Sequence, residues 1–431
     1  MDGGMLWYHF PCRGVQSFPG KLCASRWFTP NHRLLNREVF QVSNTCGFKH
    51  AGTSSDVREP SGRWQRFEKN PLIRYFRRLK WVSIPLSLGF AYLAYQQFWH
   101  VYKREKSKVT SGTQLATDFE VTLIKMLPLR TSSRLWGWIN NIKLPLPLRS
   151  PVINWFANTY NCNIEEALVD DVTQYQNLGE FFRRSLKPGV RPICEGKCVV
   201  SPADGTVLNF GKVQNGRVEQ VKGITYSLPG FLGPNFGKSS IKKVESEMAP
   251  DDDKTYQKLL LRSNEETDLY HCIIYLSPGD YHRFHSPADW SVSYRRHFPG
   301  ELLSVRPGFV NWIAGLFNIN ERVVYTGTWC HGFFSMVAVG ATNVGSIRVY
   351  FDRELVTNER IWKKDGSKDH SFESSNNISG IQLKKGDEFG EFNLGSTIVL
   401  IFEGPKDLNF AIRAGQKVKY GEPLMLVEDK S

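Results

Sequence analysis

A change in residue pattern near Pro192 divides this 431-residue chain into two parts with different secondary structure. After Pro192, short runs of β-branched and aromatic residues alternate with Gly, Pro, Asn and Asp, as in CVVSPADGTVLNF (198–210) and STIVLIFEG (396–404). Runs of this kind, bounded by turn residues, are typical of β-strands. We therefore expect an α+β fold, in which a helical region at 115–190 precedes a mainly β domain at 191–431.

The expected helical region mixes tryptophans with basic residues. Trp136, Trp138 and Trp155 lie close in sequence to Arg134 and Lys143. Short helices of this composition suit the surface of a lipid bilayer. Ordinary helices that pack their aromatic side chains inward are the alternative. We expect this region to be membrane-proximal.

An uncharged run of nineteen residues, Trp81–Trp99, precedes the helical region. A helix of this length spans about 28 Å, which is close to the thickness of a hydrocarbon core. The pattern predicts one transmembrane helix at 81–100, and a buried or surface-lying helix is the alternative. Four Lys or Arg residues flank the run on each side, so the distribution of positive charge indicates no orientation.

The first 70 residues have the composition of a targeting leader. Up to Arg37 there are five cations and a single acid, Asp2. This pattern favours a mitochondrial leader over a secretory signal, which needs an apolar core near its start. A merely disordered basic tail is the alternative. The net charge of +13 would also suit nucleic acid, but the second half has no arginine-rich stripe with interleaved aromatics, so we expect no nucleic-acid partner.

Eight cysteines are scattered at irregular spacings along the chain. Cys194 and Cys198 are close, but no second pair completes a zinc site, and disulfide frameworks belong to short secreted chains. We therefore expect free thiols and no metal.

Four stretches of the β-rich part carry residue types that support chemistry. They are SPADGTV (201–207), GDYHRFHSP (279–287), HFPGELLSV (297–305) and EFNLGSTIVL (391–400). A serine hydroxyl such as that of Ser396 becomes a strong nucleophile when a base takes its proton and a third group orients the base. Asp204 and His285 could fill these two roles.

Each of these residues also has a simpler interpretation. Ser396 could merely begin a strand, and Asp204 with Gly205 could form a hairpin turn. His282 and His285 could be a metal pair, although no third ligand is near in sequence.

In order and spacing, the four stretches resemble the phosphatidylserine decarboxylase family. FFRRSLKPGVRPI (181–193) and VKGITYSLPGFLG (221–233) add to the resemblance, which covers roughly residues 120–428. The family's self-cleavage motif, Leu394-Gly395-Ser396-Thr397, is intact. The resemblance implies a lyase that converts phosphatidylserine to phosphatidylethanolamine and CO2.

The resemblance also implies self-cleavage at Gly395–Ser396, with Asp204, His285 and Ser396 acting as a charge relay. The Ser396 hydroxyl attacks the Gly395 carbonyl, and Gly395 is expected to permit a strained turn there. Elimination and hydrolysis then leave a pyruvoyl group at Ser396. A β chain of 1–395 and an α chain of 396–431 would remain together as a heterodimer.

The implied cofactor is this covalent pyruvoyl group, which forms a Schiff base with the serine amine of the lipid and accepts electrons when CO2 leaves. His282 is our candidate proton donor in decarboxylation, since histidine titrates near neutral pH. A role limited to hydrogen bonding with lipid phosphate or backbone is the alternative.

The resemblance to the mitochondrial form implies a single-pass protein of the mitochondrial inner membrane, with its catalytic domain facing the intermembrane space. AGQKVKYGEPLMLVE (414–428) is also similar to the hairpin of lipoyl and biotinyl carrier domains, but lacks their Met-Lys-Met tip, so we expect only a related sandwich- or barrel-like architecture. A serine hydrolase is disfavoured because Ser396 is not in a Gly-x-Ser-x-Gly elbow. A non-catalytic membrane scaffold and a pyruvoyl-dependent decarboxylase of a free amino acid are further alternatives.

Overall fold

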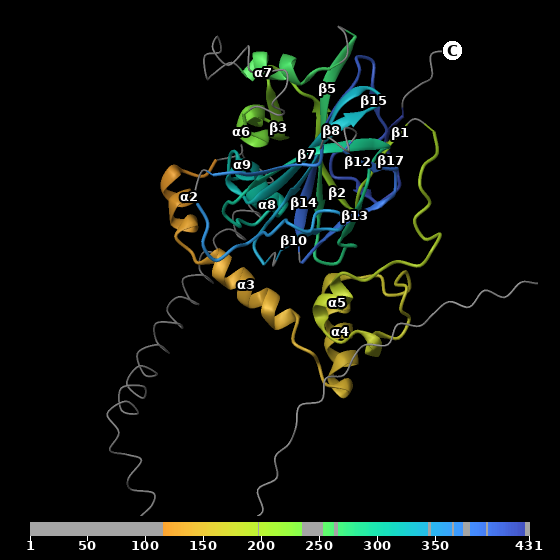
Figure 1. Ribbon diagram of the computed structural model, residues 1–431. Coiled ribbons are helices and arrows are strands. Elements are labelled where there is room, and N and C mark those ends of the chain that lie inside the picture. The colour runs from red at the N-terminus through yellow and green to blue at the C-terminus, as the bar shows by residue number, and fades with distance from the viewer. Residues whose placement is uncertain are drawn as a thin grey trace, which may run out of the picture. The chain divides into compact units, whose positions relative to one another are not determined.

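A computed structural model of the chain describes residues 115–196, 198–234, 253–262, 266–343, 346–363, 366–373, 380–393 and 395–426 (Figure 1). All of them belong to one compact unit, Gly89–Ser431. The predicted leader at 1–70 and the predicted transmembrane helix at 81–100 lie outside the described residues. Within the ranges given above, no helix is both long and apolar enough to cross a membrane.

The first part of the described chain is helical, as its colours from orange to yellow-green in Figure 1 show. Its elements are α2 (Asp118–Lys125), α3 (Leu129–Asn140), α4 (Leu146–Tyr160), the 3₁₀ turn η1 (Val172–Gln174) and α5 (Leu178–Phe182). A capping box begins α2, because Thr117 and Glu120 satisfy each other's backbone N–H groups. Several large apolar side chains of these helices stay exposed, among them Phe119, Trp138 and Trp155.

A nine-stranded sheet forms the centre of the β-rich part. Its strand order is β11 (Lys368–Ser371), β7 (Trp290–Phe298), β8 (Arg322–Trp329), β9 (Gly332–Val339), β14 (Ser396–Pro405), β5 (Thr267–Leu276), β2 (Gly205–Lys212) and β16 (Lys417–Val418), and β12 (Ile381–Leu383) also pairs with β7. All of these pairings are antiparallel.

Smaller sheets and short helices complete the described fold. One sheet has the order β1 (Cys198–Val200), β17 (Pro423–Leu426), β15 (Asn409–Phe410), another the order β10 (Ile347–Val349), β13 (Glu388–Phe392), β6 (Arg283–His285), and β3 (Arg217–Val221) pairs with β4 (Ile224–Ser227). The short helices are α6 (Leu228–Leu232), α7 (Asp253–Leu260), α8 (Pro307–Val310) and α9 (Leu316–Ile319).

Strands β5 and β14 are buried on both faces. In β14, Ile398 and Leu400 enter one hydrophobic core, while Val399 and Ile401 enter a second. A strand covered on both sides has a continuous apolar run instead of an alternating one. This explains the unbroken sequence that follows Ser396, and it places that residue at the end of a deeply buried strand.

The prediction of an α+β chain with a mainly β catalytic part is confirmed. One local prediction and one of the simpler alternatives are wrong. Residues 414–428 form no carrier-like hairpin, because β16 covers the edge of β2 and β17 lies between β1 and β15. Asp204 and Gly205 form no hairpin turn either. A Cβ on Gly205 would lie 2.5 Å from the Tyr275 carbonyl oxygen, so glycine permits the close approach of β2 to β5. Five cysteines lie in the described residues and form no disulfide with one another: Cys162, Cys194, Cys198, Cys272 and Cys330.

Candidate functional site

Ser396 is the first residue of β14 and pairs with Leu276, the last residue of β5. It is fully buried, yet its hydroxyl has no hydrogen-bond partner among the described residues. A buried polar group without a partner costs about 1–3 kcal/mol in proteins. Such an orphan in a native core indicates a functional or strained group rather than ordinary packing. The neighbouring Thr397 hydroxyl is likewise without a partner among the described residues, so the role of Ser396 stays a prediction.

Gly395, whose carbonyl would be attacked, follows Leu394, which lies outside the described residues. Gly395 is absent from the described residues with a left-handed backbone, and a Cβ added to it would meet no atom within 4 Å. The strained turn expected at Gly395 stays a prediction.

His282 lies in the turn that follows β5 and is fully buried. Its Nδ1 donates to the Asp280 carbonyl at 2.8 Å, and its Nε2 has no partner among the described residues. Burial lowers the pKa of His282 to about 3, against the opposing effect of the Asp280 bond, and the positive charge of Arg184 adds to the lowering. The imidazole is thus neutral at physiological pH, with a free lone pair on Nε2.

His282 is tied to the chain segment that leads to Ser396. Its backbone carbonyl accepts a hydrogen bond from the Phe392 N–H at 3.0 Å. Phe392 precedes Ser396 by four residues. His285 instead pairs with Glu388, further back along β13. Of the two histidines, His282 therefore bonds the residue that is nearer in sequence to the proposed cleavage point.

His285 is buried, and both of its ring nitrogens are engaged. Nδ1 donates to the Gly386 carbonyl at 3.0 Å, and Nε2 lies 3.1 Å from the Tyr281 hydroxyl. The ring stacks on Tyr420, with centroids 4.0 Å apart. Burial lowers the pKa of His285, and the Gly386 bond and the charges of Glu388 and Asp204 partly oppose that effect.

Asp204 is held by Arg191. The guanidinium makes two bonds to the carboxylate, Nε to Oδ1 at 3.1 Å and Nη2 to Oδ2 at 2.6 Å. The Tyr420 N–H donates to the same carboxylate at 2.9 Å. Arg191 also binds Glu166, and this hydrogen bond lowers the pKa of Glu166 to about 2. A bidentate pair of this kind is strong and directional.

Two of the three predicted relay residues, Asp204 and His285, contact the same residue, Tyr420. Tyr420 donates its backbone N–H to Asp204 and stacks its ring on His285. No hydrogen bond among the described residues joins either of them to Ser396. The complete relay therefore stays a prediction.

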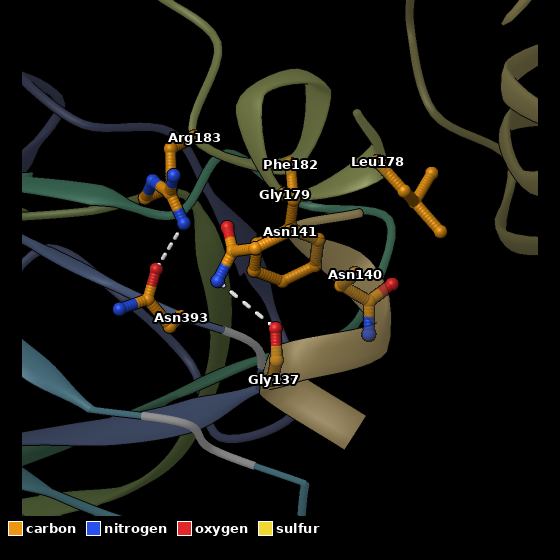
Figure 2. Close-up of a pocket in the computed structure, with 8 residues that line it drawn as sticks. All are labelled: Gly137, Asn140, Asn141, Leu178, Gly179, Phe182, Arg183 and Asn393. Carbon is orange, nitrogen blue, oxygen red and sulfur yellow. Dashed lines mark hydrogen bonds between the residues drawn. The ribbon is translucent and has the colours of Figure 1, made fainter. Parts of the chain in front are cut away.

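The FFRR stretch reaches the loop before Ser396. Arg183 donates to the side-chain oxygen of Asn393, three residues before Ser396, and Figure 2 shows the two side chains pointing toward each other. Phe182 lies against the His282 ring, with centroids 3.9 Å apart. The pocket in Figure 2 has a volume of about 10 Å³, which leaves no room for a lipid headgroup.

Three residues of this site were missed by the sequence analysis as individual contributors. Arg191 belongs to the quoted FFRRSLKPGVRPI stretch, and Tyr281 to GDYHRFHSP, so the motifs pointed to their neighbourhood. Tyr420 lies in the quoted 414–428 stretch, which was interpreted as a carrier-like hairpin and not as part of the site. In the described part of the chain, no group of three or more His, Cys, Asp or Glu side chains could hold a metal ion.

Comparison with known proteins points in one direction. The family model described as "Phosphatidylserine decarboxylase" matches residues 178–426. A "Phosphatidylserine decarboxylase proenzyme, mitochondrial" from Cricetulus griseus is 51% identical over 354 residues, which cover 82% of this chain and 85% of that protein. A protein of the same name from Caenorhabditis elegans is 38% identical over 349 residues, covering 80% and 83%. "Phosphatidylserine decarboxylase proenzyme 1, mitochondrial" from Saccharomyces cerevisiae is 39% identical over 365 residues, covering 70% and 73%.

Proposed function

The chain belongs to the phosphatidylserine decarboxylase family, and we propose that it performs this family's reaction with a pyruvoyl group that it makes from its own Ser396. The resemblance inferred from the motifs is confirmed. The chain is an enzyme, a lyase that removes CO2 from phosphatidylserine and leaves phosphatidylethanolamine. The observation that supports the Ser396 proposal best is a fully buried hydroxyl without a partner, next to Gly395.

Self-cleavage is the first step of the proposal. The Ser396 Oγ attacks the Gly395 carbonyl carbon and converts the amide to an ester, and His285 takes the hydroxyl proton. Asp204 would orient that histidine and stabilise its charged form. In the uncut chain His285 Nε2 faces the Tyr281 hydroxyl and Nδ1 bonds the Gly386 carbonyl. The relay therefore requires His285 to exchange Tyr281 for Ser396 at Nε2 and Gly386 for Asp204 at Nδ1. Elimination then breaks the ester, and hydrolysis releases ammonia.

Burial of Ser396 favours this self-directed chemistry over a serine hydrolase. A hydrolase must present its nucleophile to an external substrate, whereas the Ser396 side chain is enclosed by its own strands. The same burial is no obstacle to attack on the adjacent peptide carbonyl. No observation favours the scaffold or the free amino-acid decarboxylase.

The pyruvoyl group supplies the electron sink that the loss of CO2 requires. His282 would move the proton. Its Nδ1–H is fixed by the Asp280 carbonyl, so Nε2 can accept a proton from the substrate ammonium. The same atom can return that proton to Cα after CO2 leaves. Near-neutral titration, on which the sequence-based role was argued, does not hold for His282, because burial lowers its pKa to about 3. The neutral imidazole is therefore a weak base and its protonated form a strong acid, so a proton that it takes up would pass readily to Cα.

The two cleaved chains would stay together through the sheet. The proposed α chain begins with β14, which pairs along ten residues with β5 and along six residues with β9 of the β chain. The cut at the start of β14, with conversion of Ser396 to pyruvoyl, removes only the N–H of Ser396 and leaves the pairings of Thr397–Pro405 with β5 in place. This supports a heterodimer of 1–395 and 396–431.

A location on the mitochondrial inner membrane completes the proposal. The names of the relatives support a mitochondrial location. Exposed Phe119, Trp138 and Trp155 on α2–α4 suit contact with lipid, and a single span at 81–100 would anchor the chain. We place the catalytic domain in the intermembrane space, and assign a sandwich- or barrel-like architecture to it, by resemblance to the family.

Intact-mass analysis of the purified protein tests the proposal. We expect two chains, of which 396–431 is lighter by one ammonia than the same segment with an N-terminal serine. A single uncut chain with decarboxylase activity would contradict the proposed cofactor. A cut chain that keeps an N-terminal serine would indicate proteolysis instead.

A further inference from the structure

Arg184 differs from the other buried arginines of the described chain. It is 4% exposed, and no carboxylate among the described residues faces it. Its Nε has no hydrogen-bond partner there, a feature that it shares with Arg130 and Arg295. Its one described hydrogen bond is a long one, from Nη2 to the Gly279 carbonyl at 3.4 Å. The guanidinium also lies over the Phe181 ring, 5.1 Å from its centroid. A buried cation so poorly satisfied is expensive to maintain in the free protein.

The other buried arginines of the described chain face a carboxylate or several carbonyls. Four of them face a carboxylate: Arg130 with Glu321 at 3.0 Å, Arg191 with Asp204 at 2.6 Å, Arg295 with Asp352 at 3.3 Å and Arg296 with Asp369 at 2.9 Å. The fifth, Arg322, donates to four backbone carbonyls and lies over the Phe298 ring. The fold therefore supplies a counter-charge or several acceptors to these arginines, and the missing carboxylate beside Arg184 is a specific feature of its position.

Arg184 lines a pocket of about 420 Å³ between α5, β6 and β13. Four arginines and two glutamates are among the lining residues: Arg183, Arg184, Arg283, Arg348, Glu180 and Glu391. Glu391 is already shared by Arg183, Arg348 and the Tyr350 hydroxyl. Glu180 accepts from the backbone N–H of Gln176. The lining thus has an excess of two positive charges, and neither carboxylate contacts Arg184.

Three contacts link the pocket lining to the chain segments around the proposed reaction centre. Arg184 is close enough to His282 to lower its pKa. Its hydrogen-bond partner Gly279 follows Leu276, the residue that pairs with Ser396, by three positions. Arg183, which also lines the pocket, bonds Asn393 just before Ser396. A headgroup bound to Arg184 would therefore contact a side chain whose neighbours are tied to both segments that flank Ser396.

We propose that Arg184 and its pocket bind the phosphodiester of the lipid headgroup. This inference rests on the proposed function. The substrate offers two anions, a phosphodiester and a carboxylate. The carboxylate loses its charge as CO2 leaves, so a cation bound to it would stabilise the ground state more than the transition state. The phosphodiester keeps its charge throughout, which makes it the suitable partner for a permanent buried cation.

A phosphodiester contact that persists through the reaction has a kinetic signature. Its loss raises KM and leaves kcat nearly unchanged, because ground state and transition state lose the same interaction. We expect Arg184→Met to be cut normally and to carry the ammonia-deficient 396–431 chain. Its KM for phosphatidylserine in mixed micelles should rise by about 10- to 100-fold, the effect of losing a hydrogen bond to a charged group.

Water-soluble probes distinguish the two anions. Glycerophosphoethanolamine has the phosphodiester without a carboxylate, and L-serine has the carboxylate without a phosphodiester. Inhibition of the mature enzyme by glycerophosphoethanolamine should weaken about 10- to 100-fold in Arg184→Met and less in Arg184→Lys, which keeps the charge. Inhibition by L-serine should be unchanged.

Arg295→Met is the matched control, because Arg295 is equally buried but faces Asp352. Its melting temperature should fall, since Asp352 is left unpaired, while that of Arg184→Met should not. Unchanged inhibition by glycerophosphoethanolamine in Arg184→Met, or a loss confined to L-serine, would overturn the inference. So would loss of cleavage in both Arg184 variants, which would make Arg184 structural. A wild-type chain that is not cut would instead defeat the proposed function itself.

Discussion

Two polar clusters in this protein differ in how well their hydrogen bonds are satisfied. In the Tyr420 cluster, formed by Asp204, Arg191, His285 and Tyr420, both carboxylate oxygens and both imidazole nitrogens have partners. We call Ser396, His282 and Arg184 the Ser396 centre. Each of these three side chains has a buried polar atom that makes no hydrogen bond to any described residue. The two clusters lie in the same domain and are both deeply buried.

This difference indicates a division of work. A satisfied buried network stabilises the fold and holds its members in one geometry. Orphan polar atoms lower stability, so they persist where chemistry or a ligand uses them. On this argument we propose that the Ser396 centre carries out the reaction, while the Tyr420 cluster holds a candidate base and a candidate carboxylate.

Ser396→Ala should have the largest effect on function and almost none on stability. It removes both the attacking group and the precursor of the cofactor, so we expect one uncut chain without decarboxylase activity. Because the hydroxyl has no partner, the melting temperature should not fall. A denaturing gel and a thermal scan measure both.

Ser335→Ala on the neighbouring strand β9 is the control for that experiment. Its hydroxyl donates to the Tyr325 carbonyl at 3.0 Å, so its removal should reduce stability by about 1 kcal/mol and leave cleavage intact. A Ser396→Ala protein that is processed normally would show that the orphan hydroxyl has no part in cleavage.

Changes in the Tyr420 cluster should affect both cleavage and stability. His285→Ala should abolish processing, because the Ser396 hydroxyl then keeps its proton, and Asp204→Asn should impair it. Asp204→Asn should also lower the free energy of unfolding by about 1–3 kcal/mol, because one partner of the buried Arg191 loses its charge. Pulse labelling measures the rate of processing, and denaturant unfolding measures the free energy of unfolding. Wild-type processing in both variants would make the cluster purely structural.

His282→Ala should separate cleavage from decarboxylation. The variant should still be cut and carry the pyruvoyl mass, because His285 is assigned to cleavage. Its turnover should fall by about 10²–10⁴, the usual contribution of general acid–base catalysis. Intact mass and a CO2-release assay provide the readouts. Full activity in a fully cut His282→Ala protein would reject its catalytic role.

The smallest expected effect is that of moderate acid on the activity of the folded enzyme. The pKa of His282 is lowered to about 3, so its Nε2 stays unprotonated well below pH 6.5, and no loss of kcat is expected from this group there. An acid limb of kcat near pH 6.5 that His282→Ala abolishes would contradict the assignment.

The free energy of unfolding, unlike kcat, should decrease as the pH falls below 6.5. Burial also lowers the pKa of His271, to about 4. As the pH falls below 6.5, the unfolded chain binds protons at both histidines while the folded chain does not, so the free energy of unfolding decreases. The slope is up to about 1.4 kcal/mol per pH unit for each group until its folded pKa is reached. Urea unfolding at several pH values checks it.

The amino-acid sequence alone determined the chemistry and the class of fold. Short runs of β-branched residues predicted the strands, because that preference is local. The LGST motif pointed to Ser396 as the candidate nucleophile, and His282 and His285 were the candidate bases. Each of these motifs consists of consecutive residues, so it can be read without knowing the fold. The continuous apolar run after Ser396 predicted a strand. That this strand is buried between two hydrophobic cores could not be predicted from it.

Only the tertiary structure decided which polar atoms meet. Asp204 binds the backbone of Tyr420, and Arg183 reaches Asn393, although these partners are far apart in sequence. The predicted hairpin at 414–428 failed for the same reason, because its strands found better partners in β2 and in β1 and β15. Nor does the sequence distinguish Arg184 from Arg295. Among the described residues, Arg184 faces no carboxylate, whereas Arg295 faces Asp352. This difference arises only when segments distant in sequence pack together and exclude water from the two arginines.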